Sequence, residues 1–308
     1  MQIQKLPSPW WLGGERPSEF LRVAAPAKVN LFLEVLARRP DGYHAIETLM
    51  VAVSLYDTLD LAAAETLTLE CDRPDLSVGP DNLVLRAARL LQEQTGCTAG
   101  ARMILSKRIP IAAGLAGGSA NAAAALVGLN ELWQLRLPAE ALAALAGRLG
   151  SDVPFFLGRP AAWCTGRGEI ITPETQAQPL HLVIAAPPQG LSTAEVYRGV
   201  EVPAEPVSGE AIRAALRAGD SVQVGRLLHN RLQASAERIS VAVTELCRLL
   251  ERLDVLGARM SGSGSSVFGV CRDRRDALRV ASQLSAQLAA GAAHSLEQTR
   301  VIVVQSVV

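Results

Sequence analysis

Three glycines lie between a predicted strand and an alanine-rich segment. Residues 101–106 alternate as a strand does, Gly114, Gly117 and Gly118 follow, and apolar residues then recur at helical spacing. Glycine lets a backbone approach a ligand closely. The first N–H groups of a helix have no internal partner and lie at the positive end of the helix dipole. We therefore expect a phosphate-binding turn, with the helix opening at residues 119–121.

Two other interpretations of this segment involve no ligand. Residues 109–130 carry no charge and are long enough to suggest a membrane span, but Pro110 and the clustered glycines would expose backbone to lipid. A structural turn that leads into a buried helix remains open. The segment lacks the Gly-Lys-Ser/Thr ending of a Walker loop, so its hold on a phosphate would not use a loop lysine.

Two charged residues are candidates for catalysis. Lys28 shares the polar face of a predicted strand at residues 26–36 with Asn30, so both side chains would point into one cleft. A solvated lysine fits the same pattern. Asp152 follows a predicted helix stop and precedes a proline, where a turn or capping aspartate is the simplest local interpretation.

Candidate substrate-binding residues lie beside turns. Tyr43 and His44 follow an Asp-Gly hairpin signal, and alternation would place them on opposite faces of a strand. Thr193 either contacts a substrate or caps a helix. Residues 262–264 form a Gly-Ser-Gly turn whose N–H groups either approach a substrate or serve only as a hinge.

The predicted helices and strands fall into two groups. The pattern of the sequence changes between them, near residues 176–178. Before this change, a β-meander is predicted, then a helix from Asp81 to Gly96, a strand, the glycine loop with its helix, a helix from Pro138 to Gly150, and a strand pair. The predicted strands are residues 26–36, 43–53, 55–61, 67–70, 101–106, 161–165 and 169–171.

After residue 178, predicted strands and helices alternate, which suggests an α+β domain. The predicted strands are residues 181–185, 267–270 and 301–304, and the predicted helices are 211–218, 222–232, 241–253 and 276–288. We expect a loosely ordered extension at residues 1–20 and domains at residues 21–176 and 177–308.

Composition limits the function classes. Of 308 residues, 49% are hydrophobic and 19% charged, and the formal net charge is +0, so no whole-chain electrostatic footprint for nucleic acid or an anionic membrane exists. The five cysteines show no metal-ligand spacing, and residues 1–19 lack a signal-peptide apolar region. We expect a cytoplasmic protein with reduced thiols.

Residues 110–120 resemble the phosphate loop of the GHMP kinases, which phosphorylate small alcohols with ATP. Residues 26–31, 39–44, 150–156 and 261–264 are similar, in the same order, to the branch of that family that phosphorylates the 2-hydroxyl of 4-diphosphocytidyl-2-C-methyl-D-erythritol in non-mevalonate isoprenoid precursor biosynthesis. The resemblance implies an α+β, two-domain GHMP kinase fold. Its N-terminal, ATP-binding domain would be ribosomal-S5-like, and its C-terminal, substrate-side domain would be ferredoxin-like.

The resemblance also implies roles for individual residues. Lys28 would be an electrostatic catalytic group and Asp152 the general base. Tyr43 would stack on cytosine, and His44 would read its edge. ATP would bind Pro110, Ile111, Ala112, Ala113, Gly114, Leu115, Ala116, Gly117, Gly118, Ser119 and Ala120. Substrate would bind Asn30, Tyr43, His44, Thr193, Gly262, Ser263 and Gly264.

Two positions depart from the family's glycine run. Ala116 replaces a glycine and fits if its φ is negative, while Ala120 replaces a serine and leaves Ser119 as the candidate hydroxyl for Mg²⁺ or phosphate. Mg²⁺ is implied with ATP, but the sequence assigns neither its ligands nor the oligomeric state.

The resemblance implies a kinase acting on a small molecule that carries a cytidine diphosphate group, with no nucleic-acid or membrane partner. Another GHMP kinase, of the homoserine or mevalonate type, is the first alternative. A nucleotide-binding module without catalysis is the second.

Overall fold

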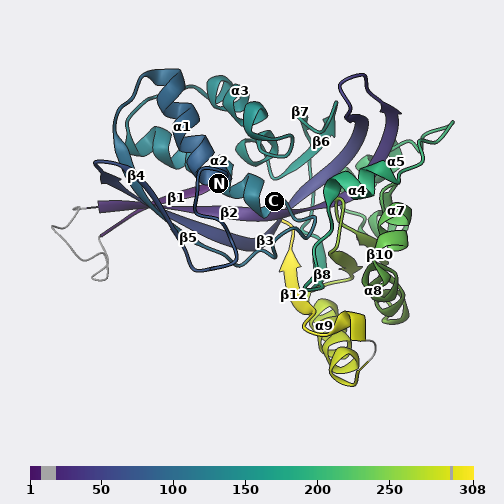
Figure 1. The fold of residues 1–308 in the computed structure, drawn as a ribbon. Helices are drawn as coiled ribbons and strands as arrows, with labels where there is room; N and C mark the ends of the chain where they lie inside the picture. Colours follow the sequence, from purple (N-terminus) through teal and green to yellow (C-terminus); the bar gives the residue numbers. More distant parts are fainter. Residues whose placement is uncertain (8–18, 292–293) are drawn as a thin grey trace. The chain divides into compact units, whose positions relative to one another are not determined.

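The computed structural model describes residues 1–7, 19–291 and 294–308, in two compact units (Figure 1). Strands β2 (Glu19–Arg38) and β3 (His44–Ala64) are each divided between the two units, with one part in the first unit and one part in the second. The first unit comprises Met1–Ala27, Leu55–Ile109 and Gly117–Leu157, and the second comprises Lys28–Ser54, Pro110–Ala116 and Gly158–Val308.

The first unit contains strands β1 (Gln2–Pro7), β4 (Leu67–Cys71) and β5 (Gly100–Ser106) with its parts of β2 and β3. β1 pairs antiparallel with β2, and β3 pairs antiparallel with β5. β4 runs parallel to β5, so the expected meander is wrong at this strand. A parallel pair needs a crossover, which helix α1 (Leu83–Thr95) supplies between them.

Three helices of this unit lie on one face of its strands (Figure 1). α1 ends at Gly96, whose φ is +71°, as expected, but its N-cap is Asn82 rather than Asp81, because the Asn82 side chain accepts the Val84 N–H at 2.9 Å. α2 (Gly117–Leu132) is buried over most of its surface, since its small residues let neighbouring elements approach closely. α3 (Ala139–Leu149) follows Pro138 and stops at Gly150, and the short helix η1 (Pro154–Leu157) ends the unit.

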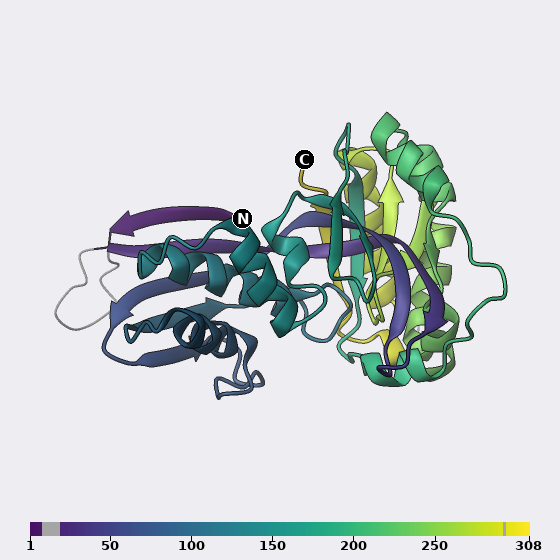
Figure 2. The ribbon, with the colours of Figure 1, turned by 90° about the horizontal axis from the view of Figure 1, so that it is seen from above.

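The second unit contains an antiparallel four-stranded sheet in the order β10-β11-β8-β12. Helices α8 (Val241–Arg252) and α9 (Arg274–Ala289) pack on it (Figure 2). They bury apolar side chains against it. This sheet with its helices gives the α+β character expected from the sequence. The strands are β8 (His181–Ala186), β10 (Gly257–Met260), β11 (Val267–Cys271) and β12 (Arg300–Gln305).

The other strands of the second unit flank its parts of β2 and β3. β6 (Ala161–Thr165) pairs with β3 and with β7 (Ile170–Pro173), and β9 (His229–Asn230) runs parallel to β2. The remaining helices are α4 (Thr193–Arg198), α5 (Glu210–Ala218), α6 (Ser221–Arg226), α7 (Gln233–Ile239) and η2 (His294–Leu296).

Three further expectations differ from the structure. Residues 44–64 form one strand rather than two, since neither glycine nor proline interrupts them. The helix expected at 222–232 ends at Arg226, because the next residues pair with β2 as β9. The extension is ordered at residues 2–7, which form β1, while its Trp10-Trp11 and Gly13-Gly14 pairs lie outside the described residues.

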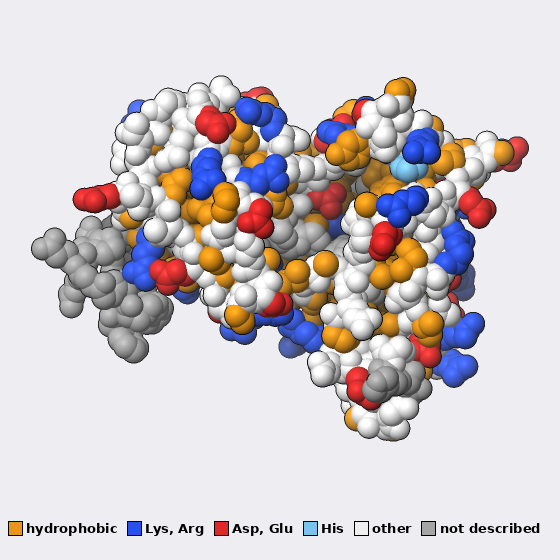
Figure 3. Space-filling view, in the orientation of Figure 1, with side chains coloured by type: hydrophobic (Ala, Val, Ile, Leu, Met, Phe, Trp, Pro, Cys, Tyr) orange, Lys and Arg blue, Asp and Glu red, His pale blue; other side chains and the backbone are white. Residues whose placement is uncertain are grey.

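Within the described ranges, no helix combines the length and apolar character that crossing a membrane requires. Basic and acidic side chains are interspersed on the face of the molecule that Figure 3 shows, without a large area of either sign.

Candidate functional site

Two glycine-containing loops that are distant in the sequence are joined by hydrogen bonds in the second unit. Pro110–Ala116 lies against residues 261–266, where the Ser261 hydroxyl donates to the Gly114 carbonyl at 3.0 Å and the Ser266 N–H donates to the Ala113 carbonyl at 3.2 Å. A Cβ on Gly114 would lie 2.0 Å from the Ser261 carbonyl oxygen, and the φ of Gly114 is +75°. Glycine is therefore required there by the packing of the two loops.

Lys28 is anchored beside both loops. Its side chain is buried, and its ammonium nitrogen donates to the Asn30 side-chain oxygen at 2.6 Å and to the Gly114 carbonyl at 3.1 Å. A Cβ on Gly262 would lie 3.1 Å from that nitrogen, so the 261–266 loop passes close to the cation. The Lys28 N–H also donates to the Leu115 carbonyl. These contacts fix one positive charge against the backbone of the predicted phosphate loop.

The Asn30 amide is held in one orientation. Its NH₂ group donates to the Thr48 hydroxyl at 2.8 Å, and that hydroxyl donates to the Phe32 carbonyl at 2.6 Å. The amide oxygen therefore faces Lys28. The expectation that Lys28 and Asn30 point to the same place holds, because alternate residues of β2 share a face.

Helix α2 begins at Gly117, two residues before the expected start. A Cβ on Gly117 would lie 3.0 Å from Ile109 Cγ2 and 3.1 Å from Lys107 Nζ, so packing restricts this position. A Cβ on Gly118 would meet nothing nearer than 3.6 Å, and Gly118 is exposed. The protein's own packing does not require a glycine at 118, and the open backbone there suits a ligand.

A buried polar cluster supports the start of α2 within the first unit. The Asp57 carboxylate accepts the N–H groups of Arg108 and Ile109 at 2.7 and 2.9 Å and the Asn121 amide at 2.9 Å. Lys107 Nζ forms an ion pair with Asp57 and donates to Asn121 at 3.0 Å. The cluster ties the chain after β5 to the first turns of the helix, and sequence reasoning missed it.

Asp152 lies in the turn between α3 and η1, in the first unit, and is half-buried. The Val153 N–H donates to the Gly150 carbonyl at 3.2 Å, which closes this turn. Lys28 belongs to the second unit. The two predicted catalytic residues are thus carried by different units, and the catalytic roles of both remain predictions.

The predicted base-binding residues contact different partners. Tyr43 is 54% exposed, and the Arg167 guanidinium lies 4.7 Å from its ring centroid. The His44 ring lies 5.3 Å from the Tyr197 ring at a tilt of 31°. Burial, together with the charge of Arg38, lowers the pKa of His44, which favours the neutral imidazole, a group that both donates and accepts a hydrogen bond. Tyr197 was not among the residues expected from the sequence.

Thr193 and Ser263 come together in the structure, since their hydroxyl oxygens lie 2.9 Å apart. Thr193 is the first residue of α4, and the cap is Ser192, whose hydroxyl accepts the Glu195 N–H at 3.4 Å. The alternative of Thr193 as a helix cap is therefore wrong.

The condition under which Ala116 would fit without strain, a negative φ, is not met. Its φ is +54°, and that of Ala112 is +52°. Alanine carries a steric penalty in this region that glycine does not. The loop keeps the backbone shape of a glycine-rich turn at two positions where the sequence has alanine.

The residues that sequence reasoning missed share one property: their partners are distant in the sequence. Ser261 contacts Asn30 and Gly114, and Tyr197 contacts His44. Glu34 is one more residue that was not singled out. Its only signal in the sequence is that it shares the polar face of β2 with Lys28.

Two family models match this chain. The family model of the GHMP kinases N terminal domain matches residues 82–159, and that of the GHMP kinases C terminal domain matches residues 212–290. A crystal structure of a homoserine kinase from Cytophaga hutchinsonii superposes with a TM-score of 0.72 at 17% identity, covering 94% of this chain and 95% of that one, and shows the fold alone. Fold and loops define a protein of the GHMP kinase class.

More similar relatives narrow the class. The 4-diphosphocytidyl-2-C-methyl-D-erythritol kinases of Pelotomaculum thermopropionicum and Symbiobacterium thermophilum are 43% and 47% identical, over 84% and 82% of this chain and 92% of each relative. A crystal structure of 4-(cytidine 5'-diphospho)-2C-methyl-D-erythritol kinase has a TM-score of 0.75 at 35% identity and covers 93% of this chain and 100% of that one. The chain belongs to the family of these kinases.

Proposed function

We propose that this protein transfers the γ-phosphoryl group of ATP to the 2-hydroxyl group of 4-diphosphocytidyl-2-C-methyl-D-erythritol. Family membership supports the reaction. The observation that carries the proposal is the anchoring of Lys28 against the Gly114 carbonyl and the 261–266 loop. Phosphoryl transfer depends mainly on positioning and charge stabilisation, and a buried, oriented cation supplies both.

ATP is proposed to bind at residues 110–120. The exposed backbone at Gly118 suits the phosphates, as do the first N–H groups of α2, which have no acceptor within a helix. Mg²⁺ is bound by hard oxygen ligands, usually substrate phosphates with one or two protein groups. Ser119 is half-buried in the first turn of α2, and we propose its hydroxyl for that role. The bound metal would neutralise charge on the phosphates.

The cytidine group is proposed to bind at Tyr43 and His44, with Tyr197 beside them. The exposed ring of Tyr43 offers a stacking face, and the neutral imidazole of His44 offers a donor and an acceptor to a base edge. Thr193, Ser263 and the turn at residues 262–264 are proposed to contact the rest of the substrate, since their hydroxyls already meet. In this proposal residues 21–176 form the ATP-binding domain and residues 177–308 the substrate-side domain.

Asp152 is proposed as the general base that takes the proton of the acceptor hydroxyl. A base of this kind contributes about 10²–10⁴ in rate. Asp152→Asn keeps the shape of the side chain and removes the base, so we expect kcat to fall by about that factor with ATP binding retained. The exposed Asp75 of the same unit gives the matched control, and Asp75→Asn should keep kcat within about twofold. Near-normal turnover of Asp152→Asn would remove Asp152 from the base role.

A panel of acceptor alcohols tests the substrate. ATP consumption should depend on 4-diphosphocytidyl-2-C-methyl-D-erythritol, and homoserine and mevalonate should give none. Turnover of either rival alcohol without the cytidyl substrate would overturn the assignment. Tyr43→Ala should raise the KM of the cytidyl substrate by about 10-fold or more, the scale of one stacked base, and leave the KM of ATP within twofold.

A further inference from the structure

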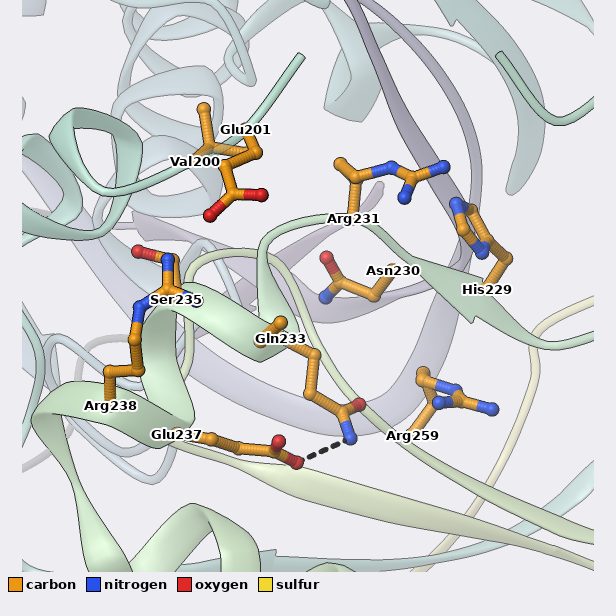
Figure 4. A pocket seen from close by; sticks show the side chains of 11 residues that line it. Val200, Glu201, His229, Asn230, Arg231, Gln233, Ser235, Glu237, Arg238 and Arg259 are labelled. Carbon is orange, nitrogen blue, oxygen red and sulfur yellow. Dashed lines mark hydrogen bonds between the residues drawn. The ribbon is translucent and has the colours of Figure 1, made fainter. Parts of the chain in front are cut away.

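A pocket in the second unit lies apart from the residues proposed for the reaction. Its volume is about 330 Å³, and none of the eleven residues that line it is among those proposed to bind ATP or the cytidyl substrate. The walls come from β9 and the residue Arg231 after it, from α7, from the residue Arg259 on β10, and from the chain after α4 (Figure 4). Pockets of this size hold small molecules.

One end of the pocket is basic. Arg231, His229 and Arg259 enter from the same side of the view in Figure 4. Arg231 is already paired, because its guanidinium forms two hydrogen bonds of 2.7 and 2.8 Å with the fully buried Glu34 carboxylate. The Glu34 charge therefore balances Arg231 and leaves the basic end with a second cation, Arg259.

Arg259 lacks such a carboxylate. Its Nε is buried and has no hydrogen-bond partner, and no described acidic side chain forms an ion pair with it. A buried donor without a partner is uncommon in a folded protein and calls for an acceptor. The guanidinium presents donors in a planar fork that matches phosphate oxygens. His229 Nε2 lies 3.1 Å from the Glu34 carboxylate, and burial lowers the pKa of His229, so its neutral ring adds no further cation.

The other end of the pocket carries acceptors. Glu201 lies on the opposite side of the view in Figure 4 from Arg259, and the Glu237 carboxylate, below Gln233 in that view, accepts the Gln233 amide at 2.8 Å. Arg238 lies near them, but its guanidinium donates to the Gly199 carbonyl at 2.5 Å. Carboxylates at this end suit a ligand that carries hydroxyl donors.

We propose that this pocket binds a small hydroxylated phosphate ester, with its phosphate at Arg259, beside His229, and its hydroxyl groups toward Glu201. Asn230 lines this pocket and also holds the 261–266 loop, because its amide donates to the carbonyls of Met260 and Gly262 at 2.7 and 2.8 Å. A ligand here would therefore contact the residue that holds the 261–266 loop.

Titration calorimetry with glycerol 3-phosphate tests the proposal on the full chain. The protein is first saturated with a non-hydrolysable ATP analogue, so that the phosphate loop is filled. Glycerol 3-phosphate should bind with a Kd at least fivefold below that of inorganic phosphate, and glycerol alone should not bind. Absence of binding in the wild type overturns the proposal, and equal affinity for the two phosphates overturns the assignment to a hydroxylated ester.

Two matched arginine variants locate the binding. Arg259→Gln should raise the Kd of glycerol 3-phosphate at least 10-fold, whereas Arg252→Gln, at an exposed position of α8, should change it less than twofold. Unchanged affinity in Arg259→Gln would overturn the site.

A second readout needs no variant of Arg259. Glycerol 3-phosphate should shift the imidazole NMR signals of His229, assigned with His229→Gln, and leave those of His181 in place. A stationary His229 signal would overturn the proposal even if Arg259→Gln failed to fold. Because no turnover is measured, these outcomes are separate from those of the kinase assay.

Discussion

The ammonium nitrogen of Lys28 lies 2.6 Å from the side-chain oxygen of Asn30, and Thr48 holds that amide in place. The cation is thus oriented by the protein before any ligand binds. Preorganisation of this kind is what makes a buried charge effective in stabilising a transition state. The positive charge of Lys28 and the orientation given by Asn30 are therefore separable contributions.

Substitution of Lys28 tests the charge. Lys28→Met keeps the length of the side chain and removes the cation, so kcat should fall by about 10²–10³, the usual effect of removing one such group. Asn30→Ala keeps the cation and removes its orientation, so we expect a smaller loss, about 10-fold. The measurement is steady-state turnover of ATP with the cytidyl substrate.

The exposed Lys5 provides the control for this pair. Lys5→Met should leave kcat within about twofold, because a surface ion pair contributes little. If Lys28→Met retained most of the turnover, Lys28 would have a structural role only.

The glycines of the phosphate loop should separate into two kinds. Gly118→Ala has room for the methyl group and replaces a helical glycine, so the protein should become more stable by up to about 1 kcal/mol. The same methyl group would crowd a bound phosphate, and the KM of ATP should rise about 10-fold. Urea unfolding and steady-state kinetics measure the two effects.

Gly114→Ala should behave in the opposite way. A Cβ at that position would lie 2.0 Å from the Ser261 carbonyl oxygen, so the two loops would have to separate and stability should fall by about 3 kcal/mol. If Gly118→Ala left the KM of ATP unchanged, the phosphates would not approach the backbone at this residue.

The loop could be recognised from the sequence because its signal is local. Glycines between a strand and an alanine-rich helix define a turn, and the alternation of residues 26–36 placed Lys28 and Asn30 on one face. The partners of these residues could not be inferred in the same way. Ser261 and Gly114 are 147 positions apart in the sequence and meet only when the chain between them is folded. Pairing at that separation leaves no periodicity in either segment.

The errors in the strands have the same cause. The parallel pairing of β4 with β5 and the two-residue strand β9 exist because of neighbours that local sequence does not specify. His229 and Asn230 follow a helical pattern and were expected to continue it, but pairing with β2 outweighed that propensity. The continuity of β3 differs, because there the absence of a helix or strand breaker was visible in the sequence.

Ala116 offers a test of backbone strain. With φ at +54°, alanine costs about 1–2 kcal/mol that glycine does not. Ala116→Gly should therefore stabilise the protein by about 1 kcal/mol, after the larger entropy of glycine in the unfolded chain is subtracted. Ala113→Gly, at a neighbouring buried alanine outside the left-handed region, should instead destabilise it by about 1 kcal/mol. Equal losses in both variants, measured by urea unfolding, would contradict the strain at Ala116.

Glu34 should make stability depend on pH. Burial raises the pKa of this carboxyl, but hydrogen bonds from Arg231 and from the N–H groups of Val207 and Val35, with the charge of His229, outweigh burial and lower the pKa from 4.5 to about 2. A lowered pKa in the folded state means that the stabilisation is complete above the unfolded value and is lost as the pH falls through the folded value. The stabilisation by Glu34 should therefore be lost as the pH is lowered from about 5 to about 2.

The size of this loss follows from the shift in pKa, which corresponds to about 3 kcal/mol when Glu34 is fully ionised. Glu34→Gln isolates the contribution of Glu34 to stability, because the variant leaves Arg231 without its carboxylate at every pH. At pH 7 the variant should be less stable than the wild type by about 3–5 kcal/mol, the usual cost of breaking a buried ion pair. By pH 3 that difference should have narrowed by about 2 kcal/mol, since the wild type loses the stabilisation and the variant has none to lose. Urea unfolding of both proteins at pH 7, 5 and 3 measures the difference, and a constant gap across this range would show that Glu34 does not titrate with a lowered pKa.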